Sequence, residues 1–351
     1  MKRINNLFFQ FCSFQNLLSA WRKTRRGSAK NVESAAFFLN MEKELFALQA
    51  ELRSGEWSPV PYRFFEIRDP KQRTIAVSTF RDRVVHHALV NVLEPVFEKI
   101  FIKDSYATRK GKGVHAAVWR AQHFLRGHKW FLKTDVEKFF DSVNHDVLYD
   151  ILCRRIKDRR LLAVCDTIIR HGGKEGCGLP IGNRTSQFFA NVCLDPLDHF
   201  VKDRCGERGY VRYMDDFVVF QNDKIRLKAL RIEIAGFLEE KLQLYLKPSA
   251  TFLQARQNGL SFLGRRIFPG AVRLRPENLR RIMRRVRVRE AQWRDGDLDE
   301  TAFLHSMNSY WAMLSYYPST FPLRQSLLHP PPLKGNVIDL RIMQQLETAK
   351  R

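Results

Sequence analysis

YVRYMDDFVVF, residues 210–220, is the stretch of this chain that decides its fold. Two β-prone runs, 210–213 and 217–220, flank a short acidic turn, and this pattern predicts a β-hairpin. Adjacent carboxylates at a hairpin tip repel each other unless a cation joins them, and a divalent ion bound by carboxylates and substrate phosphates would relieve that repulsion. Taken alone, Asp215 and Asp216 also fit an ordinary solvated turn, because acidic turns are common in proteins.

A third carboxylate, Asp135, favours a metal site over an ordinary solvated turn. It follows another β-prone run, 130–132, and two aromatic residues, Phe139 and Phe140, come shortly after it. Two-metal phosphoryl or nucleotidyl transfer requires several carboxylates from different strands that converge on one point. Asp135 together with Asp215 could supply such a set, so the sequence favours a catalytic metal site over an inert turn.

The composition favours a folded protein that binds polyanions. The 351 residues are enough for two or three subdomains, and 44% of them are apolar. Lysine and arginine total 60 against 37 acidic residues, which gives a formal net charge of +23. A surplus of this size attracts phosphate backbones, with an anionic membrane surface as the competing partner. No apolar run is long enough to cross a bilayer, so the sequence predicts no membrane-spanning segment.

The six cysteines are scattered and form no Cys-x-x-Cys pair. This distribution predicts neither a zinc site nor a disulfide framework, and reduced thiols in a cytoplasm fit it best.

Hydrophobic periodicity and turn residues divide the chain into a helical start and a mixed remainder. Helices are expected up to about Gly55, over Arg83–Phe97, around 147–152, from near Thr185, and over Ile225–Leu242. Extended segments are expected over Tyr62–Val77, over 130–135, and as a strand pair near Leu260–Leu274. An arginine-dense helix is expected beyond Pro276, followed by another over Ser306–Tyr317.

Four motifs occur in the order and rough spacing of the reverse-transcriptase palm. They are DVxxFF at 135–140, GLPIG at 178–182, YMDD at 213–216 and FLG at 262–264. The chain therefore resembles reverse transcriptases over roughly Phe37–Ser326. The resemblance implies an α+β right-hand polymerase fold. Its parts would be N-terminal helices and fingers at 1–128, an antiparallel-sheet palm at 129–275, and a small helical thumb with a C-terminal tail at 276–351.

The middle motif resembles that of one subgroup of reverse transcriptases. Most reverse transcriptases carry Gln-Gly-x-x-x-Ser-Pro in the middle motif, whereas this chain has IGNRTSQ at 181–187. The isoleucine and the final glutamine are similar to the reverse transcriptases of diversity-generating retroelements, as are FRDRVVHH at 80–87 and KGKG at 110–113. Sequence drift in a retron-type or group II intron-like enzyme is the alternative.

The resemblance implies roles for individual residues around two magnesium ions. Asp135, Asp215 and Asp216 match the metal-binding catalytic carboxylates, and the backbone carbonyl of Val136 could also contact metal. Phe140 matches the aromatic gate that excludes a ribose 2′-hydroxyl, with plain core packing as its alternative. The nucleotide-binding set comprises Arg68, Lys71, Arg73, Phe140, Ile181, Gly182 and Gln187.

Basic residues in two further segments are expected to contact nucleic acid. Arg109, Lys110 and Lys112 alternate with flexible glycines and could approach template phosphates, although a basic surface loop fits equally well. The arginine-dense helix falls where the thumb of the family tracks duplex phosphates, with Arg280, Arg284 and Arg287 as candidates. Many relatives carry a lysine near position 250, where this chain has Ala250, so a general-acid role for Lys247 is in doubt.

The function implied by the resemblance is RNA-directed DNA synthesis in a bacterial or phage-encoded system. A diversity-generating enzyme would copy template-repeat RNA into adenine-mutagenised cDNA from dNTPs for mutagenic retrohoming. It would work with a small, basic, oligomeric accessory variability protein. A catalytically silent RNA-binding scaffold is the alternative from another class, which the three intact carboxylates disfavour.

Overall fold

The computed structural model describes residues 3–26, 32–68, 72–317 and 320–321. Its contacts divide the chain into two compact units, Met1–Arg256 and Gln257–Arg351. Helices and strands are mixed in both units, as the α+β expectation required. The finer division at 128/129 and 275/276 stays a prediction. No helix in the described part of the chain is long and apolar enough to cross a membrane.

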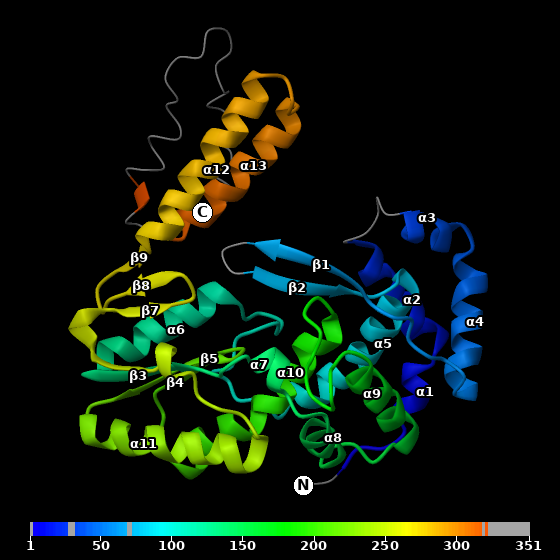
Figure 1. The fold of residues 1–351 in the computed structure, drawn as a ribbon, viewed down its shortest axis with the longest axis horizontal. Helices are drawn as coiled ribbons and strands as arrows, with labels where there is room; N and C mark the ends of the chain where they lie inside the picture. Colours follow the sequence, from blue (N-terminus) through cyan, green and yellow to red (C-terminus); the bar gives the residue numbers. More distant parts are fainter. Residues whose placement is uncertain (1–2, 27–31, 69–71, 318–319, 322–351) are drawn as a thin grey trace. The chain divides into compact units, whose positions relative to one another are not determined.

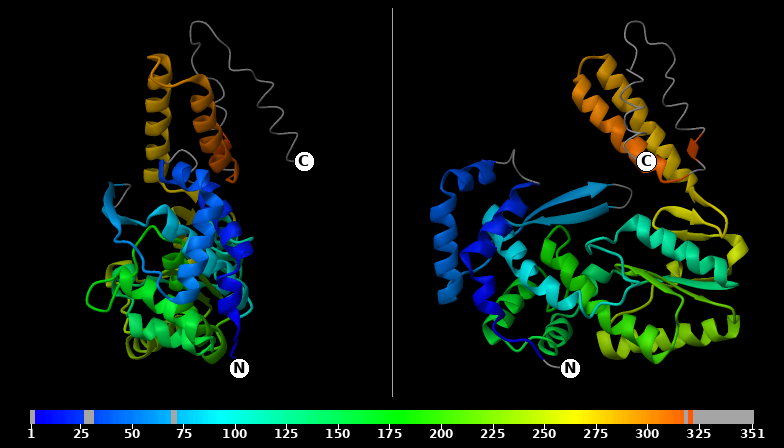
Figure 2. Two further views of the ribbon diagram at one scale, coloured as in Figure 1. Left: turned by 90° about the vertical axis from the view of Figure 1, so that its right-hand side faces the viewer. Right: turned by 180° about the vertical axis from the view of Figure 1, so that it is seen from behind.

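A four-stranded antiparallel sheet lies at one end of the first unit (Figure 1). Its strand order is β4-β5-β3-β6, and it confirms the predicted hairpin at the acidic turn. Helices α6 (Val114–Gly127) and α11 (Lys224–Phe237) cover its opposite faces (Figures 1 and 2), which explains why residues 217–220 are all buried. The strands are β3 (Trp130–Asp135), β4 (Tyr210–Tyr213), β5 (Asp216–Gln221) and β6 (Phe252–Ala255).

Helices and one hairpin complete the first unit. The predicted helices over Arg83–Phe97, around 147–152 and from near Thr185 are confirmed as α5, α8 and α10. The extended segment over Tyr62–Val77 is the antiparallel hairpin of β1 (Arg63–Arg68) and β2 (Gln72–Val77). The helices are α1 (Leu7–Phe11), α2 (Phe14–Arg26), α3 (Val32–Leu39), α4 (Met41–Ser54), α5 (Phe80–Phe97), α6 (Val114–Gly127), α7 (Phe139–Ser142), α8 (His145–Cys153), α9 (Arg159–His171), α10 (Arg184–His199) and α11 (Lys224–Phe237).

The second unit begins with a small sheet and continues as a helical hairpin. Three short antiparallel strands, β7 (Leu260–Phe262), β8 (Arg265–Ile267) and β9 (Val272–Leu274), replace the strand pair expected there. Leu263 and Gly264 both have positive φ, so the chain reverses immediately after β7 and leaves room for a third strand. Helices α12 (Pro276–Arg294) and α13 (Glu300–Ser315) follow, with the rings of Trp293 and Phe303 stacked 4.9 Å apart.

Candidate active site

Strand pairing brings together the three carboxylates singled out in the sequence. In the β4–β5 hairpin Tyr213 pairs with Asp216, so Met214 and Asp215 form a two-residue turn. The neighbouring strand β3 pairs with β5 on its other side and places Asp135 directly opposite Asp216. Residues far apart in the sequence therefore meet at one end of the sheet.

Asp135 and Asp215 are the two carboxylates whose charge has little compensation from the protein. Burial, and after it the charge of Asp135, raises the pKa of Asp215 well above its usual value. In the described part of the chain, Asp135 Oδ1 is buried and has no hydrogen-bond partner. A buried carboxylate oxygen without a donor is rare, and a bound cation is one of its ordinary explanations.

Asp216 has a different environment. The ammonium group of Lys133 lies 2.8 Å from Asp216 Oδ1. Lys133 precedes Asp135 by two residues on β3, so both side chains lie on the same face of the sheet. The protein itself therefore neutralises Asp216.

The site suits a divalent ion held by two carboxylates in an open site, rather than one fully enclosed by protein ligands. Among the residues that the structure describes, no group of three His, Cys, Asp or Glu side chains is arranged to hold a metal. Asp135 and Asp215 form the fitting pair, because their mutual repulsion is what a cation would remove. Substrate phosphates and water commonly complete the shell of Mg²⁺ in such open sites.

The backbone next to Asp135 is fixed by an isolated bridge between Val136 and Leu246. Its two hydrogen bonds run from Glu137 N to Tyr245 O and from Lys247 N to Asp135 O, each 2.8 Å long. Neither bond uses the Val136 carbonyl. Lys247 thus holds the main chain of a catalytic candidate through its own backbone, whatever its side chain does.

A fully buried ion pair, which no sequence motif predicted, lies beneath the turn. Arg212 Nε and Nη2 donate to the two carboxylate oxygens of Asp198 over 2.7 and 2.6 Å. The Tyr210 hydroxyl donates to the same carboxylate over 2.8 Å. The signal in the sequence was an arginine inside a β-prone run, because a charge is almost never buried without a partner.

Three residues of the predicted nucleotide-binding set line one cavity of about 720 Å³, namely Arg73, Phe140 and Ile181. Phe140 is half-buried at the start of α7, whereas Phe139 belongs to the core. Gly182 adjoins them, and a Cβ there would lie 2.6 Å from the Ala76 carbonyl oxygen. Asp135, Asp215 and Asp216 are not among the residues that line this cavity.

The other members of the set lie apart from that cavity. Arg68 is exposed at the end of β1, opposite Gln72, and Gln187 is half-buried on α10. Lys71 lies outside the described residues.

Comparison with known proteins identifies the family. The family model described as reverse transcriptase (RNA-dependent DNA polymerase) matches residues 68–267. This range includes all of the four-stranded sheet and the three carboxylates Asp135, Asp215 and Asp216. The chain belongs to this family. It is an RNA-directed DNA polymerase by that membership, and the diversity-generating subgroup is not part of the match.

Relatives of this reverse transcriptase include bacterial and intron-encoded proteins. Protein YkfC of Escherichia coli is 28% identical over 271 residues, covering 64% of this chain and 71% of YkfC. The group II intron-encoded protein LtrA of Lactococcus lactis is 25% identical over 201 residues, covering 54% of this chain and 33% of LtrA. The chain thus spans only about a third of LtrA.

Among solved structures, apo telomerase from Candida Tropicalis covers 62% of this chain and 49% of its own, with 13% identity and a TM-score of 0.48.

The basic loop of this reverse transcriptase contains one arginine with an internal role. Arg109 donates to the Glu98 carboxylate through Nε and Nη2 and to the carbonyls of Ile102 and Ser105 through Nη1. Its side chain is 6% exposed, so its guanidinium is largely used within the protein. Lys112 donates to the Lys103 carbonyl over 2.7 Å, and Lys110 is exposed.

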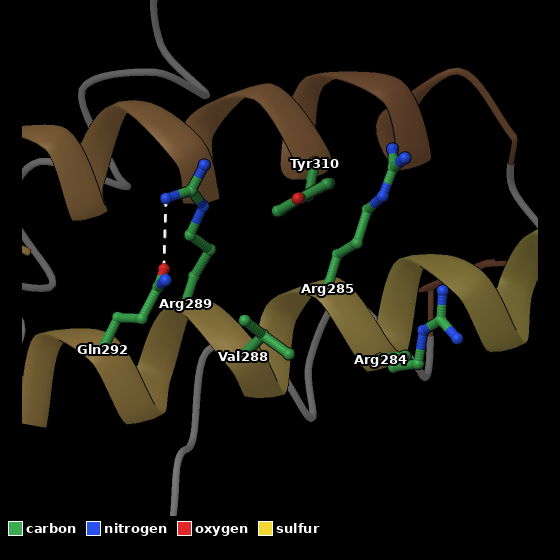
Figure 3. Close-up of a pocket in the computed structure, with 6 residues that line it drawn as sticks. All are labelled: Arg284, Arg285, Val288, Arg289, Gln292 and Tyr310. Atoms are coloured by element: carbon green, nitrogen blue, oxygen red, sulfur yellow. Dashed lines mark hydrogen bonds between the residues drawn. The ribbon is translucent and has the colours of Figure 1, made fainter. Parts of the chain in front are cut away.

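The three arginines expected on the thumb share an exposed face of α12. Arg280, Arg284 and Arg287 are spaced at i, i+4 and i+7 and are all exposed, while Ile282 and Val286 are buried. A groove of about 620 Å³ lies between α12 and α13. Figure 3 shows Arg284, Arg285 and Arg289 on one of its walls and Tyr310 on the other.

Proposed function

We propose that this chain extends a primer 3′-hydroxyl along an RNA template, with Asp135 and Asp215 as the central catalytic carboxylates. The main supporting observation is that the end of β3 and the β4–β5 turn bring these half-buried, mutually repelling carboxylates together, within the family match at 68–267. Each addition joins the 3′-oxygen to the α-phosphorus of a deoxynucleotide and releases pyrophosphate. Two magnesium ions bound by Asp135, Asp215 and the Val136 carbonyl would supply charge neutralisation at the phosphates.

The chain's own side chains would orient the nucleotide around that pair. Arg73 presents a forked donor to the 720 Å³ cavity and suits a triphosphate. Phe140 offers a ring on the wall of the same cavity, where a ribose 2′-hydroxyl would collide with it. Lys133 holds Asp216, which makes Asp216 an auxiliary carboxylate in this proposal. The net charge of +23 supports binding of RNA and of the cDNA product.

We further propose that this polymerase belongs to a diversity-generating retroelement and copies template-repeat RNA with errors at adenine. The supporting residues are Ile181 and Gln187, which replace a glutamine and a proline in the middle motif. Ile181 lines the cavity with an apolar side chain and offers shape but no hydrogen bond. Weaker polar contact lowers discrimination between right and wrong pairs. A small, basic accessory variability protein would be the partner.

Group II intron-like reverse transcription without adenine-directed errors is the second candidate. It is favoured by the similarity to LtrA, which is named as a group II intron-encoded protein. A retron-type enzyme belongs to the same alternative. The two candidates differ in the error spectrum of their cDNA.

Primer extension on an RNA template tests the catalytic proposal. Asp215→Ala and Asp135→Asn should each lower magnesium-dependent incorporation by at least about a thousandfold, because either change removes half of the ion-binding pair. Asp150→Asn is the matched control, since Asp150 is an exposed carboxylate on α8. Incorporation at the wild-type rate by folded Asp215→Ala would refute the mechanism.

Sequencing the cDNA tests the subgroup. Wild-type product should carry substitutions mainly opposite template adenine, and Ile181→Gln should reduce them. Equal, low error at all four template bases in the wild type would reject the diversity-generating assignment and leave the intron-like candidate.

A further inference from the structure

The catalytic turn is held from below by a single guanidinium. Met214 has a φ of 54°, a left-handed conformation that a side chain other than glycine rarely adopts. Arg212 Nη1 donates to the Met214 carbonyl over 3.0 Å, which fixes the orientation of that strained peptide. Asp198 in turn fixes Arg212 through two bonds. The position of Asp215, the next residue, therefore depends on where this guanidinium lies.

Asn191, on α10, completes the shell of the guanidinium and reaches a second segment. Its Oδ1 accepts from Arg212 Nη1 over 3.1 Å. Its Nδ2 donates to the Ala107 carbonyl over 2.9 Å and to Thr108 Oγ1 over 3.1 Å. Asn191 is 2% exposed, so water cannot substitute for these partners.

The chemistry of the partners permits only one orientation of this amide. Oδ1 faces an N–H donor, and Nδ2 faces a carbonyl that can only accept. Rotating the amide by half a turn would set donor against donor and acceptor against acceptor. Asn191 is therefore a directional link between two segments rather than a filler of space.

The second segment is the start of the basic loop. Thr108 also has a positive φ, 54°, and the basic residues Arg109, Lys110 and Lys112 lie within the next four positions. The main chain joins the same strand, because Tyr106 N donates to Arg212 O and Arg212 N donates to Asp104 O, both over 2.9 Å. One residue, Arg212, thus contacts the catalytic turn through its side chain and the base of the loop through its backbone.

We propose that Asn191 is a positioning residue that couples the basic loop at 107–113 to the catalytic turn. The amide joins Thr108 to Arg212, and Arg212 sets the Met214 carbonyl. Lys110 is the exposed basic residue of this loop, and template RNA held there would then fix the carboxylate geometry at the turn. The inference rests on the proposed polymerase function and assigns a role to residues that contact neither metal nor nucleotide.

The coupling predicts a kinetic signature that core packing alone does not. A residue that only stabilises the fold changes the fraction of active enzyme, and a residue that only shapes the loop changes the KM for primer–template. Loss of the link should instead lower kcat per active site at saturating template, because the turn is then no longer set by the loop.

Two variants and a conservative control probe the link from both ends. Asn191→Leu removes both sides of the amide at similar volume. Thr108→Val removes only the hydroxyl on the loop side, and Thr108→Ser retains it. Single-nucleotide extension at saturating template and dNTP, normalised by the burst amplitude, should fall roughly tenfold for Asn191→Leu and about fivefold for Thr108→Val. Thr108→Ser should keep the wild-type rate.

A double-mutant cycle decides between coupling and independent damage. In an Asn191→Leu background, Thr108→Val should have no further effect on kcat, since the link is already absent. Multiplicative losses, or a wild-type kcat in both single variants, would overturn the proposal. Should Asn191→Leu fail to fold, the contrast between Thr108→Val and Thr108→Ser decides alone, with equal rates counting against coupling. An inactive wild type would contradict the polymerase proposal instead.

Discussion

Beneath the Met214-Asp215 turn a single arginine is completely enclosed, whereas along α12 three arginines lie on an exposed face. Arg212 has a defined acceptor for each of its four bonds, in Asp198, Asn191 and Met214. Arg280, Arg284 and Arg287 share only a spacing and a charge. The enclosed arginine acts through geometry and the exposed ones through their summed field, so the two regions should respond to opposite kinds of perturbation.

Removing one arginine from each region should give the largest contrast. Arg212→Met leaves Asp198 buried without its cation, and breaking such a pair costs about 3–5 kcal/mol. Arg284→Met should change the free energy of unfolding by less than about 0.5 kcal/mol, as is usual for exposed positions. Urea denaturation of both variants measures the difference. Equal losses would remove the distinction between the regions.

Asp215 in the turn should make the stability of the protein depend on pH. This contrasts with the charge-compensated Arg212–Asp198 ion pair beneath the turn. The pKa of Asp215 is raised in the folded state, so the folded protein holds this proton to higher pH than the unfolded chain does. Stability without magnesium should therefore fall as pH rises from about 4, the ordinary value, through the raised pKa.

Asp215→Asn lacks that titration and should be more stable than the wild type above the raised pKa, by on the order of 1 kcal/mol. Magnesium should remove the advantage. Thermal denaturation of both proteins across pH, with and without magnesium, makes the comparison. A wild-type stability that rises with pH over that window would contradict it.

Salt should affect the exposed arginines. Replacing Arg280, Arg284 and Arg287 together by alanine should reduce the slope of log K for RNA against log salt by about 2–3. The reason is that RNA binding then releases fewer counterions, since fewer phosphates are neutralised. Each single replacement should lower the slope by less than about 1. Filter binding over a salt series is sufficient. An unchanged slope in the triple variant would mean that this face of α12 does not contact RNA.

The smallest effect is expected at Lys133. Lys133→Met frees Asp216 Oδ1 from the ammonium group 2.8 Å away, so magnesium should then bind more tightly by a few fold. Magnesium titration followed by calorimetry measures this without any reaction. Weaker binding would show that Lys133 positions Asp216 for the metal rather than competing with it.

Local pattern predicted the elements that carry the carboxylates. The β-prone runs around Asp215 and before Asp135 became β4, β5 and β3, because strands buried in a covered sheet read as short continuous apolar runs in the sequence. The strand order and the register of Asp135 against Asp216 depend on contacts between distant segments, which no window of sequence contains.

Local sequence pattern could not predict the hydrogen bonds of Asn191 for a related reason. Asn191 and Thr108 are ordinary residues in a helix and a loop, and only the fold brings them within hydrogen-bond reach. Arg109 shows the converse: its basic character suggested phosphate contact, whereas Glu98 and two carbonyls occupy its guanidinium. Composition predicts the charge of a side chain but not its partner.

The contact at Gly182 has a practical consequence for altering nucleotide selection. Ala76 N donates to the Ile181 carbonyl over 2.8 Å, and the missing side chain of Gly182 lets the Ala76 carbonyl come close. Main-chain atoms therefore set the distance between β2 and the middle motif at 181–187. Enlarging the cavity for bulky nucleotide analogues should start from the side chains of Phe140 and Ile181. Any residue larger than glycine at 182 would force the β1–β2 hairpin aside and change the mouth of the cavity instead of its volume.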